Sequence, residues 1–496
     1  MDAQVQTRSC DRKRGQVGKL TSKGCRQICI PMTRGQYDVT WNAPASVREY
    51  LEPLIRDYPE MFPASISTGY QLHGHLPESK KLPGVRLRQI RTSDGVYTLR
   101  PSFAFSYMTG TVDELEKPLF LLALHVPIWA VTFVFGRNDM YWQRLVERMG
   151  RNSLVGTTVR VSEKMPQHIA ADEHHLDWRG EKGFLAMTAA SGCTLGAALS
   201  KAADEDHLLE AYGVFDKEAR DVSPDWQPQT VNTDGWKATR NAFTKLFPKI
   251  VLLLCFLHGF LKIRDRCRKY HDLHQRVWDV YRAESADDFG IRMDAMKTWS
   301  ETADLRGPVQ ENLEKLFAHK DDYAASYAHP NCYRTSNQVD RPMNRICRSL
   351  YASRGIHGHQ ATSERRLRGL CLLENFRPFA PRSNVDRQHQ SPAHRLNDRS
   401  YHPNWLHYLL SSASDQDRIT IPLPAQVTHQ ELQPMPRRTL RHASHTHIAV
   451  TKLSHQKAGG GEPITPPGAG ACSSPRPGAG AGSSSPCGSI PTSKQR

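Results

Sequence analysis

The chain has 496 residues, of which 39% are hydrophobic, and its 66 lysines and arginines outnumber 50 acidic residues for a formal net charge of +16. This length predicts two or three domains, and the low apolar content predicts additional disordered parts. The basic excess favours a polyanionic partner, with nucleic acid first. The 11 cysteines show no disulfide framework. Without a secretion signal or a membrane span in the sequence, we expect a cytoplasmic protein with no membrane partner.

The first part of the chain divides into two segments. Residues 1–44 are basic and rich in turn-forming residues, which predicts a flexible arm. Residues 45–160 are predicted to form a helical domain, because apolar residues recur there at helical spacing. Three helices are expected in its second half, near 112–125, after Pro127, and from Asp139 to Gly150.

The last two of these helices are separated by a turn that contains Gly136, which is typical of a helix-turn-helix. The second helix carries Arg144 and Arg148, four positions apart and therefore on one face, where they would meet a phosphate or a guanine edge. Together with the charge of the chain, this pattern favours a DNA-binding domain. An ordinary helical hairpin is the alternative interpretation.

The region 165–385 differs, since short apolar runs bounded by turn residues predict strands there. Three runs follow one another directly, and two later ones alternate with helices, so the expected fold is α/β with a mixed sheet, antiparallel first and parallel later. The runs lie at 168–173, 183–192, 194–202, 231–233 and 249–255. Helical periodicity over about 259–330 predicts a helical insertion, and a further helix begins at Thr335 or Ser336.

The end of the chain, residues 418–496, is rich in proline, glycine and serine and poor in acids. This composition predicts a disordered basic tail. Its only expected contribution is non-specific affinity for phosphates.

Three carboxylates stand at comparable places in this pattern. Asp172 ends the first expected strand, Asp234 ends the fourth, and Asp340 lies on the helix after the insertion. Because they are far apart in the sequence, only the fold can bring them together. Carboxylates that converge at strand ends form a hard-oxygen site for Mg²⁺ or Mn²⁺, which activates a water or a 3′ hydroxyl for phosphodiester transfer. For Asp234 the simpler interpretation is a helix N-cap in an Asp-Gly turn.

The order of these motifs resembles the RNase H-like catalytic domain of DDE-type transposases of the bacterial insertion-sequence kind. The stretches that carry the resemblance are AADEHH, NTDGWKAT, LLLCFLH and RTSNQVDRPMNR. In the Mutator-like branch a Cys-x-x-His follows the strand after the second acid, as Cys255 and His258 do here. The similarity extends over roughly 100–415, and its last part implies a closing helical segment at 386–417.

This resemblance implies that Asp172 and Asp234 are the first and second metal ligands, with Mg²⁺ or Mn²⁺ as the cofactor. Asp340 takes the third position, where most relatives carry Glu. Glu364, in the next helical segment, is the alternative third acid because its side chain reaches farther. His258 would lie near the site and the substrate phosphate.

The same resemblance implies the partners. Arg341 and Arg345 follow the third acid on its helix and would flank the path of the substrate phosphates. The implied activity is cleavage and strand transfer of double-stranded DNA, with the terminal repeats of the element and the target DNA as partners. A homo-oligomer assembled on DNA, associated with the nucleoid, is expected.

Two other functions fit the same sequence. One is a catalytically inactive, transposase-derived DNA-binding protein. The other is a nuclease acting on RNA–DNA hybrids, which agrees with the expected sheet but not with the helix-turn-helix. A zinc site is a further alternative for one part of the chain, with the ligand set Cys255, His258, Cys267 and His271.

Overall fold

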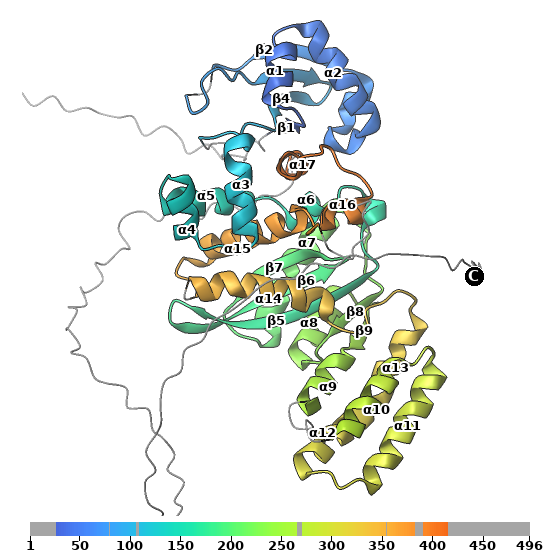
Figure 1. Ribbon diagram of the computed structural model, residues 1–496. Coiled ribbons are helices and arrows are strands. Elements are labelled where there is room, and N and C mark those ends of the chain that lie inside the picture. Colours follow the sequence, from blue (N-terminus) through green and yellow to red (C-terminus); the bar gives the residue numbers. More distant parts are fainter. Residues whose placement is uncertain are drawn as a thin grey trace, which may run out of the picture. The chain divides into compact units, whose positions relative to one another are not determined.

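Two mixed β-sheets with helices packed on them, and a separate helical bundle, make up the described part of the chain (Figure 1). The computed structural model describes residues 26–78, 80–105, 109–264, 270–353, 355–381 and 390–414. All of them lie within one unit, Met1–Val427. The expected α/β class is therefore confirmed, and the expected tail, 418–496, lies outside the described residues. No helix within these ranges is long and apolar enough to cross a membrane.

The first sheet has four strands in the order β1-β4-β3-β2, with β1 parallel to β4 and the other pairs antiparallel. Its strands are β1 (Gln27–Ile30), β2 (Gln71–His75), β3 (Arg88–Thr92) and β4 (Gly95–Pro101). The helices of this part are α1 (Arg34–Thr40), α2 (Pro44–Asp57), η1 (Pro59–Met61) and η2 (Ala64–Thr68).

The place of β1 corrects two expectations. Residues 26–44 are folded and do not belong to a flexible arm, because Ile28, Cys29 and Ile30 are fully buried in a strand that pairs with β4. Residues 45–160 are not wholly helical, since β2, β3 and β4 fall within them. The pairing of β1 with β4 joins segments far apart in the chain, which local propensity does not reveal. Residues 1–25 lie outside the described part.

The three helices expected before residue 150 are present as α3 (Val112–Ala123), α4 (Ile128–Phe135) and α5 (Asp139–Met149), followed by α6 (Leu154–Thr158) and η3 (Ser162–Lys164). Asn138 caps α5 by accepting a hydrogen bond from the Tyr141 backbone N–H. The buried face of α5 includes Trp142, which is 1% exposed, and packs on α15 (Gln360–Phe376). This helix therefore shares its core with a distant C-terminal segment.

The second sheet has five strands in the order β7-β6-β5-β8-β9. β5 (His168–Trp178), β6 (Glu181–Ala190) and β7 (Cys193–Ser200) are antiparallel neighbours, whereas β8 (Thr230–Thr233) and β9 (Val251–Leu254) run parallel to β5. The predicted change from antiparallel to parallel strands is confirmed. In this order β5 and β8, the first and fourth strands of the sheet along the chain, are neighbours.

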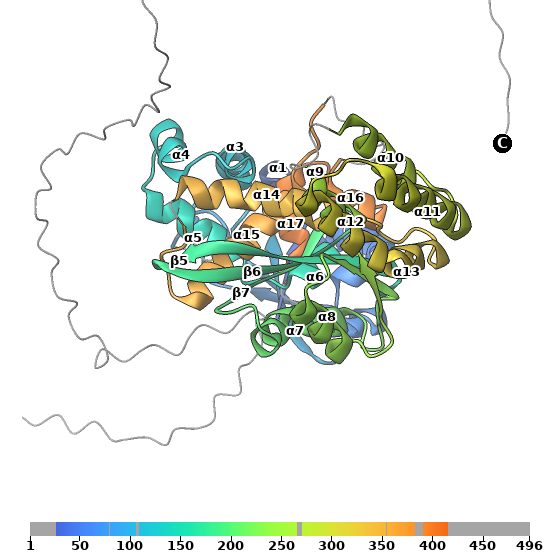
Figure 2. The ribbon, with the colours of Figure 1, turned by 90° about the horizontal axis from the view of Figure 1, so that it is seen from below.

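Alternate residues of these strands enter two different cores, as the pleat of a strand requires. One face carries α7 (Glu205–Val222) and α8 (Lys237–Leu246), and the other carries α14 (Asn337–Ala352) and α15 (Figure 2). In β6, Met187 belongs to the core that includes α14, and Ala186 belongs to the core that includes α7. Burial on both faces explains the nearly continuous apolar sequence of these strands.

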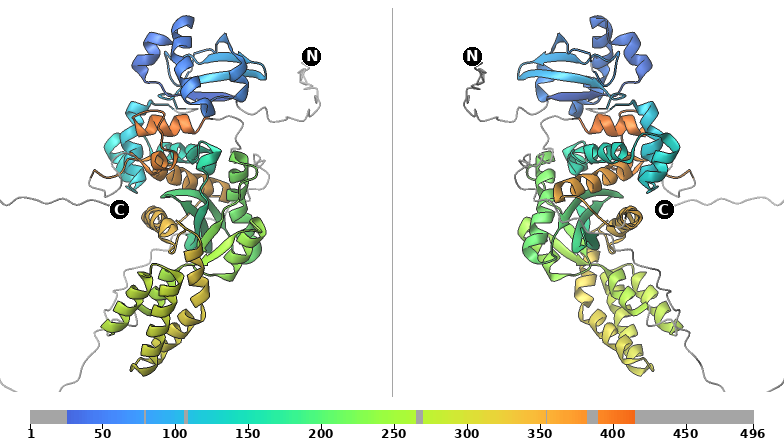
Figure 3. Two further views of the ribbon diagram at one scale, coloured as in Figure 1. Left: turned by 90° about the vertical axis from the view of Figure 1, so that its right-hand side faces the viewer. Right: turned by 90° about the vertical axis from the view of Figure 1, so that its left-hand side faces the viewer.

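Between β9 and α14 the chain forms the expected helical insertion, which gathers as a bundle with its own core (Figure 3). Phe289, Met293 and Leu313 are among the residues that fill this core. The helices are α9 (Phe256–Arg264), α10 (His271–Tyr281), α11 (Ala286–Thr302), α12 (Gly307–Ala318), α13 (Lys320–Ala324) and η4 (Ala325–Ala328). Because α9 directly follows β9, the bundle begins at the edge of the second sheet.

The helices α16 (Pro392–Asn397) and α17 (Trp405–Ser412) lie within the range expected for a closing helical segment. α17 packs on α15, α3 and β1. The His407 ring Nδ1 lies 2.6 Å from the Ser102 hydroxyl, and the Ser414 hydroxyl accepts a hydrogen bond from the Cys29 backbone N–H at 3.0 Å. The closing segment therefore ties the first sheet to the helices above the second.

Candidate metal centre

Asp172 lies inside β5 and not at its end, since the strand continues to Trp178. The expectation that this acid ends the strand is therefore wrong. The reason is that β5 continues as a ribbon with β6 beyond the residues that pair with β8. The last pair between β5 and β8 is Ala170 with Asn232, so Asp172 follows the point where the parallel pairing stops. Asp234 comes directly after β8, at the same edge.

Asp234 also has the simpler role named above, because its side chain closes an Asp-Gly turn. Its Oδ1 accepts a hydrogen bond from the Trp236 backbone N–H at 2.8 Å, just before α8. Gly235 has a φ of 92°, and a Cβ there would come 2.4 Å from Leu254, so the turn requires glycine. The Asp-Gly turn thus holds the carboxylate at the sheet edge, and the two interpretations of Asp234 are compatible.

Two clusters of potential ligand atoms meet at this edge, and both contain Asp172. One joins Asp172 to His258 and Asp340, the other joins it to Glu173 and Asp234, and within each cluster the ligand atoms lie within 4.8 Å of one another. The fold therefore brings the three predicted acids and His258 together. Sequence reasoning assigned no role to Glu173, because an acid beside another acid is usually solvated charge.

Glu173 is held by two hydroxyl groups from the helices on one face of the sheet. Tyr212 of α7 and Thr239 of α8 donate hydrogen bonds to its Oε1 at 2.5 and 2.8 Å. Its Oε2 is buried and has no hydrogen-bond partner among the described residues. Burial raises the pKa of Glu173, although the two hydroxyl donors act in the opposite direction. A buried carboxylate oxygen without a donor is costly unless a cation or a proton satisfies it.

The Ser336 hydroxyl connects the third acid with the histidine. Ser336 is fully buried before the first turn of α14, and its Oγ lies 2.7 Å from Asp340 Oδ2 and 3.2 Å from His258 Nδ1. The Cys255 Sγ lies 3.3 Å from this Oγ and accepts a hydrogen bond from the Ser336 backbone N–H at 3.1 Å. The sequence identified Ser336 only as a helix start, so its place in the site was missed.

The charges of these groups depend on one another. The pKa of Asp172 is raised, first by burial and then by the three acids around it, while His258 opposes this shift. The pKa of His258 is raised chiefly by its hydrogen bond with Cys255, and nearby negative charges add to this effect against burial. The site therefore concentrates negative charge in a place where water screens it poorly.

The donor set fits a hard divalent cation. Carboxylate oxygens predominate in it, which suits Mg²⁺ or Mn²⁺, and one imidazole nitrogen lies beside them. A cation would relieve the repulsion between the acids and would satisfy the unpartnered Glu173 Oε2. Of the alternative zinc set, Cys267 lies outside the described residues, and Cys255 already contacts Ser336.

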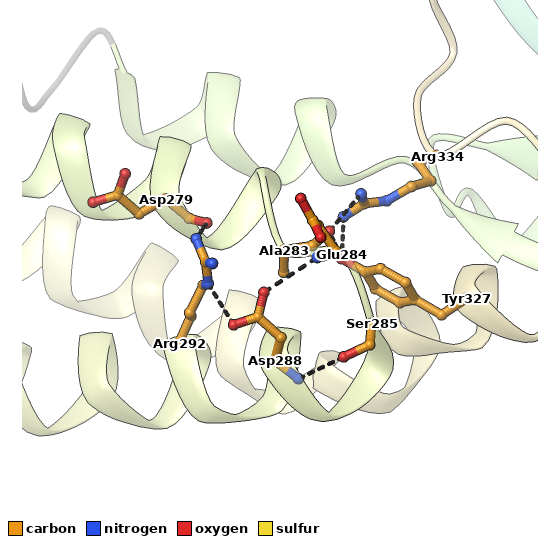
Figure 4. A network of polar contacts seen from close by, with 8 residues as sticks. All are labelled: Asp279, Ala283, Glu284, Ser285, Asp288, Arg292, Tyr327 and Arg334. Atoms are coloured by element: carbon orange, nitrogen blue, oxygen red, sulfur yellow. Dashed lines mark hydrogen bonds and ion pairs between the residues drawn. The ribbon is translucent and has the colours of Figure 1, made fainter. Parts of the chain in front are cut away.

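Arg334, two residues before Ser336, ties the helical insertion to this site (Figure 4). Its guanidinium donates hydrogen bonds to the Ala283 carbonyl at 3.3 Å and to the Tyr327 hydroxyl at 2.5 Å. The guanidinium also lies over the Tyr327 ring, 4.4 Å from its centroid. The Arg334 carbonyl accepts a hydrogen bond from the backbone N–H of Phe256, where α9 begins. The insertion therefore holds both chain segments that lead into the site.

The turn that presents the Ala283 carbonyl is fixed by its own polar contacts (Figure 4). The Ser285 hydroxyl accepts a hydrogen bond from the Asp288 backbone N–H at 3.1 Å, and the Asp288 carboxylate accepts one from the Glu284 backbone N–H at 3.1 Å. The same carboxylate pairs with Arg292 at 2.7 Å. These contacts order the connection between α10 and α11.

Glu364 does not join the metal cluster. Its Oε1 accepts a hydrogen bond from the Leu199 backbone N–H at 3.2 Å, and Leu199 belongs to β7, which β6 separates from β5. Burial raises the pKa of Glu364. Of the two candidates for the third acid, Asp340 is the one that the fold brings to Asp172. The longer side chain of Glu364 does not bring its carboxylate to Asp172, because α15 packs on β7 at the other edge of the sheet.

The four arginines predicted to contact DNA differ in their surroundings. Arg144 and Arg341 are exposed, whereas Arg148 and Arg345 are partly buried. Arg345 forms an ion pair with Glu374 at 2.8 Å, so it contributes to the packing of α14 on α15. Arg144 and Arg148 both lie outside the buried face of α5.

No protein-family model matches the chain, and neither does any curated protein.

Proposed function

We propose that this protein is a DDE-type transposase, which cleaves and joins DNA strands at an RNase H-like domain with Mg²⁺ or Mn²⁺. The observation that supports this best is the meeting of Asp234 and Asp340 around Asp172, from three distant segments of the chain. These are the three acids that the order of motifs singles out. The adjacency of β5 and β8 gives the same support, since it puts the first two acids at one sheet edge.

The side chains of the site are suited to bind a cation and a substrate phosphate. A divalent cation held by Asp172, Asp234 and Asp340 would supply Lewis-acid stabilisation and an activated water or 3′ hydroxyl. Ser336 orients Asp340 through its hydroxyl. His258 lies beside these acids, where it could contact a substrate phosphate, and its hydrogen bond with Cys255 raises its pKa.

DNA binding is assigned to the helices α3 to α5, with α5 as the recognition helix of a helix-turn-helix. Two observations support this assignment, namely the placement of Arg144 and Arg148 away from the buried face of α5 and the net charge of +16. The proposed partners are the terminal repeats of the element and target DNA, bound by a homo-oligomer.

Strand cleavage tests the proposal. The substrate is duplex DNA that carries the sequences flanking the gene, incubated with purified protein and Mg²⁺. Asp172→Asn and Asp234→Asn should each abolish cleavage without changing DNA affinity, because the acids and α5 are separate surfaces. Asp177→Asn is the control, since Asp177 lies on β5 outside both clusters and caps a turn at Gly180. EDTA should inhibit the wild type, and Mg²⁺ should restore activity.

Calorimetric titration with Mn²⁺ gives a readout that does not depend on cleavage. The wild type and Asp177→Asn should bind Mn²⁺, and the two active-site variants should not. Cleavage or Mn²⁺ binding that survives both active-site changes would overturn the proposal. An inactive DNA-binding descendant, the alternative function, predicts that the wild type binds DNA but neither binds Mn²⁺ nor cuts.

A further inference from the structure

A small pocket with both polar and apolar walls lies between α5 and α15, away from the metal centre. Its volume is about 120 Å³, which exceeds the roughly 15 Å³ that one water requires. The pocket thus has room for a tetrahedral oxyanion. The polar residues and the glycine that line it are Gln143 and Glu147 of α5, His357 and Gly358 in the loop before α15, and Thr362, Ser363 and Arg366 of α15.

Arg366 brings a guanidinium without a hydrogen-bond acceptor into this pocket, with Glu147 as the nearby opposite charge. Its guanidinium forms no hydrogen bond or ion pair with any residue that the structure describes. Burial lowers the pKa of Arg366, and the charge of Glu147 opposes this only in part. A partly buried guanidinium without a hydrogen-bond acceptor is stabilised when an anion binds there.

Ser363 offers a hydroxyl group one helical turn before Arg366. It is 4% exposed, and its Oγ has no hydrogen-bond partner among the described residues. Buried hydroxyl groups rarely lack a partner. Gly358 leaves room beside it, since a Cβ at that position would come 2.9 Å from Ser363 Oγ. Positions 363 and 366 lie on one helix face, so the same ligand can reach both groups.

The charge around the pocket is positive on balance. Glu147 is the one carboxylate among the residues that line it. Burial raises the pKa of Glu147, and the charges of four arginines act against that shift. These arginines are Arg144, Arg151, Arg365 and Arg366. In addition, α15 begins here without a side-chain cap, so its first N–H groups add partial positive charge.

The two walls of the pocket are fixed because α5 and α15 touch through glycines. A Cβ on Gly150 would come 1.7 Å from the Arg365 carbonyl oxygen, and a Cβ on Gly369 would come 2.1 Å from the Val146 carbonyl oxygen. Backbones this close leave little freedom for the helices to shift. The binding groups are therefore preorganised, which lowers the cost of ordering them around a ligand.

We propose that this pocket binds one phosphate group, with Arg366 as the cationic partner and the Ser363 hydroxyl as a hydrogen-bond donor. Guanidinium and hydroxyl groups are common donors to phosphate oxygens. The phosphate belongs to the backbone of the DNA that lies along α5, because Arg144 and Arg148 stand on the same helix. The assignment of this phosphate to DNA rests on the proposed function. The ability of the pocket to bind a phosphate does not.

The test has two arms, which separate DNA from free phosphate. In the first, affinity for duplex DNA is measured over a range of salt concentrations without divalent cation. Arg366→Ala should weaken binding by about tenfold at low salt and should reduce the slope of log affinity against log salt by about 0.9, the value for one phosphate contact. Ser363→Ala should weaken binding without changing the slope. Arg282→Ala, an exposed arginine of the insertion, is the matched control and should change neither.

In the second arm, the thermal midpoint is measured in inorganic phosphate and in chloride at equal ionic strength. Phosphate should stabilise the wild type and Arg282→Ala, but not Arg366→Ala. If Arg366→Ala fails to fold, Arg366→Gln replaces it, since Gln keeps a polar side chain without the charge. Loss of phosphate stabilisation with an unchanged DNA slope would overturn the assignment to DNA. A variant that behaves as the wild type in both arms would overturn the pocket itself.

These outcomes are distinct from failure of the proposed function. A wild type that binds DNA but neither cuts it nor binds Mn²⁺ would remove the proposed activity. The change in salt slope for Arg366→Ala would still be measurable on such a protein. A wild type that binds no DNA would overturn the DNA source, and the phosphate arm alone would then decide about the pocket.

Discussion

Ser336 and Asp340 are joined twice at the start of α14. The serine hydroxyl donates a hydrogen bond of 2.7 Å to Asp340 Oδ2, and the serine carbonyl accepts one of 2.9 Å from the Asp340 backbone N–H. A single buried residue thus fixes both the backbone and the carboxylate of the third acid. Because its hydroxyl also lies 3.2 Å from His258 Nδ1, Ser336 is a positioning residue for two groups of the site.

Replacement of Ser336 by alanine should therefore weaken the metal centre more than the fold. We expect Ser336→Ala to lower Mn²⁺ affinity and the rate of DNA cleavage by about 10- to 100-fold, the usual effect of losing a group that orients a ligand. Calorimetric titration measures the affinity, and the thermal midpoint measures the fold.

Ser349→Ala is the matched control for this change. Ser349 lies on the same helix, and its hydroxyl is 2.6 Å from His125 Nδ1, far along α14 from the acids. This variant should lose stability but keep Mn²⁺ affinity. Equal Mn²⁺ affinity in both variants would contradict a positioning role for Ser336.

The contact of Arg334 with Tyr327 predicts that the insertion stabilises the site from outside. Arg334→Ala removes two hydrogen bonds from a charged group and a cation–π contact, so we expect a loss of about 2 kcal/mol of stability in the insertion. Amide hydrogen exchange should rise in α10 to α13, and DNA cleavage should slow. Arg292→Ala, in the same network, removes a solvent-exposed ion pair and should cost less stability than Arg334→Ala. Equal exchange in the two variants would contradict this role for Arg334.

Local sequence patterns predicted the five strands of the second sheet, because each strand is an apolar run between turns. The order of motifs selected Asp172, Asp234 and Asp340, and the fold brings these acids together. Glu173 and Ser336 could not be found in this way. Their places in the site depend on burial and on hydrogen bonds to distant residues, which a single sequence does not display. Strand β1 was missed for the same reason, since it pairs with a strand far along the chain, whereas β3 and β4 form a local hairpin.

The surroundings of His407 predict a loss of stability in acid. Burial, followed by the charge of the nearby His402, lowers the pKa of His407 from its ordinary 6.5 to about 4. Above pH 6.5 the ring is neutral in the folded and the unfolded chain, so it has no effect on pH dependence there. As the pH falls from 6.5 toward 4, the unfolded chain gains a proton that the folded chain does not bind. Stability should decrease over this window, by on the order of 3 kcal/mol at most.

Thermal midpoints at about pH 7.5 and about pH 4.5 measure this loss. His407→Gln cannot titrate, so the decrease between the two pH values should be smaller in this variant than in the wild type. His319→Gln changes an exposed histidine on the insertion and should retain the full decrease. If His407→Gln loses as much stability in acid as the wild type, burial of this ring does not control the acid response.

The close packing of α5 on α15 predicts that alanine at Gly369 lowers the stability of the protein. At Gly369 a Cβ would come 2.1 Å from the Val146 carbonyl oxygen, which belongs to backbone and cannot move aside easily. Gly369→Ala should therefore push the helices apart and cost at least about 2 kcal/mol. The thermal midpoint of the purified protein should fall accordingly.

Gly213→Ala should have the opposite effect on the stability of the protein. Gly213 also lies inside a helix, α7, but nothing is within 4 Å of a Cβ added there. Alanine restricts the unfolded chain and favours the helix, so this change should stabilise the protein by about 0.5–1 kcal/mol. Because the two substitutions are chemically identical, the difference between their midpoints measures the contact alone. A midpoint for Gly369→Ala that rises as that of Gly213→Ala does would show that α5 and α15 do not approach as closely as Gly369 requires.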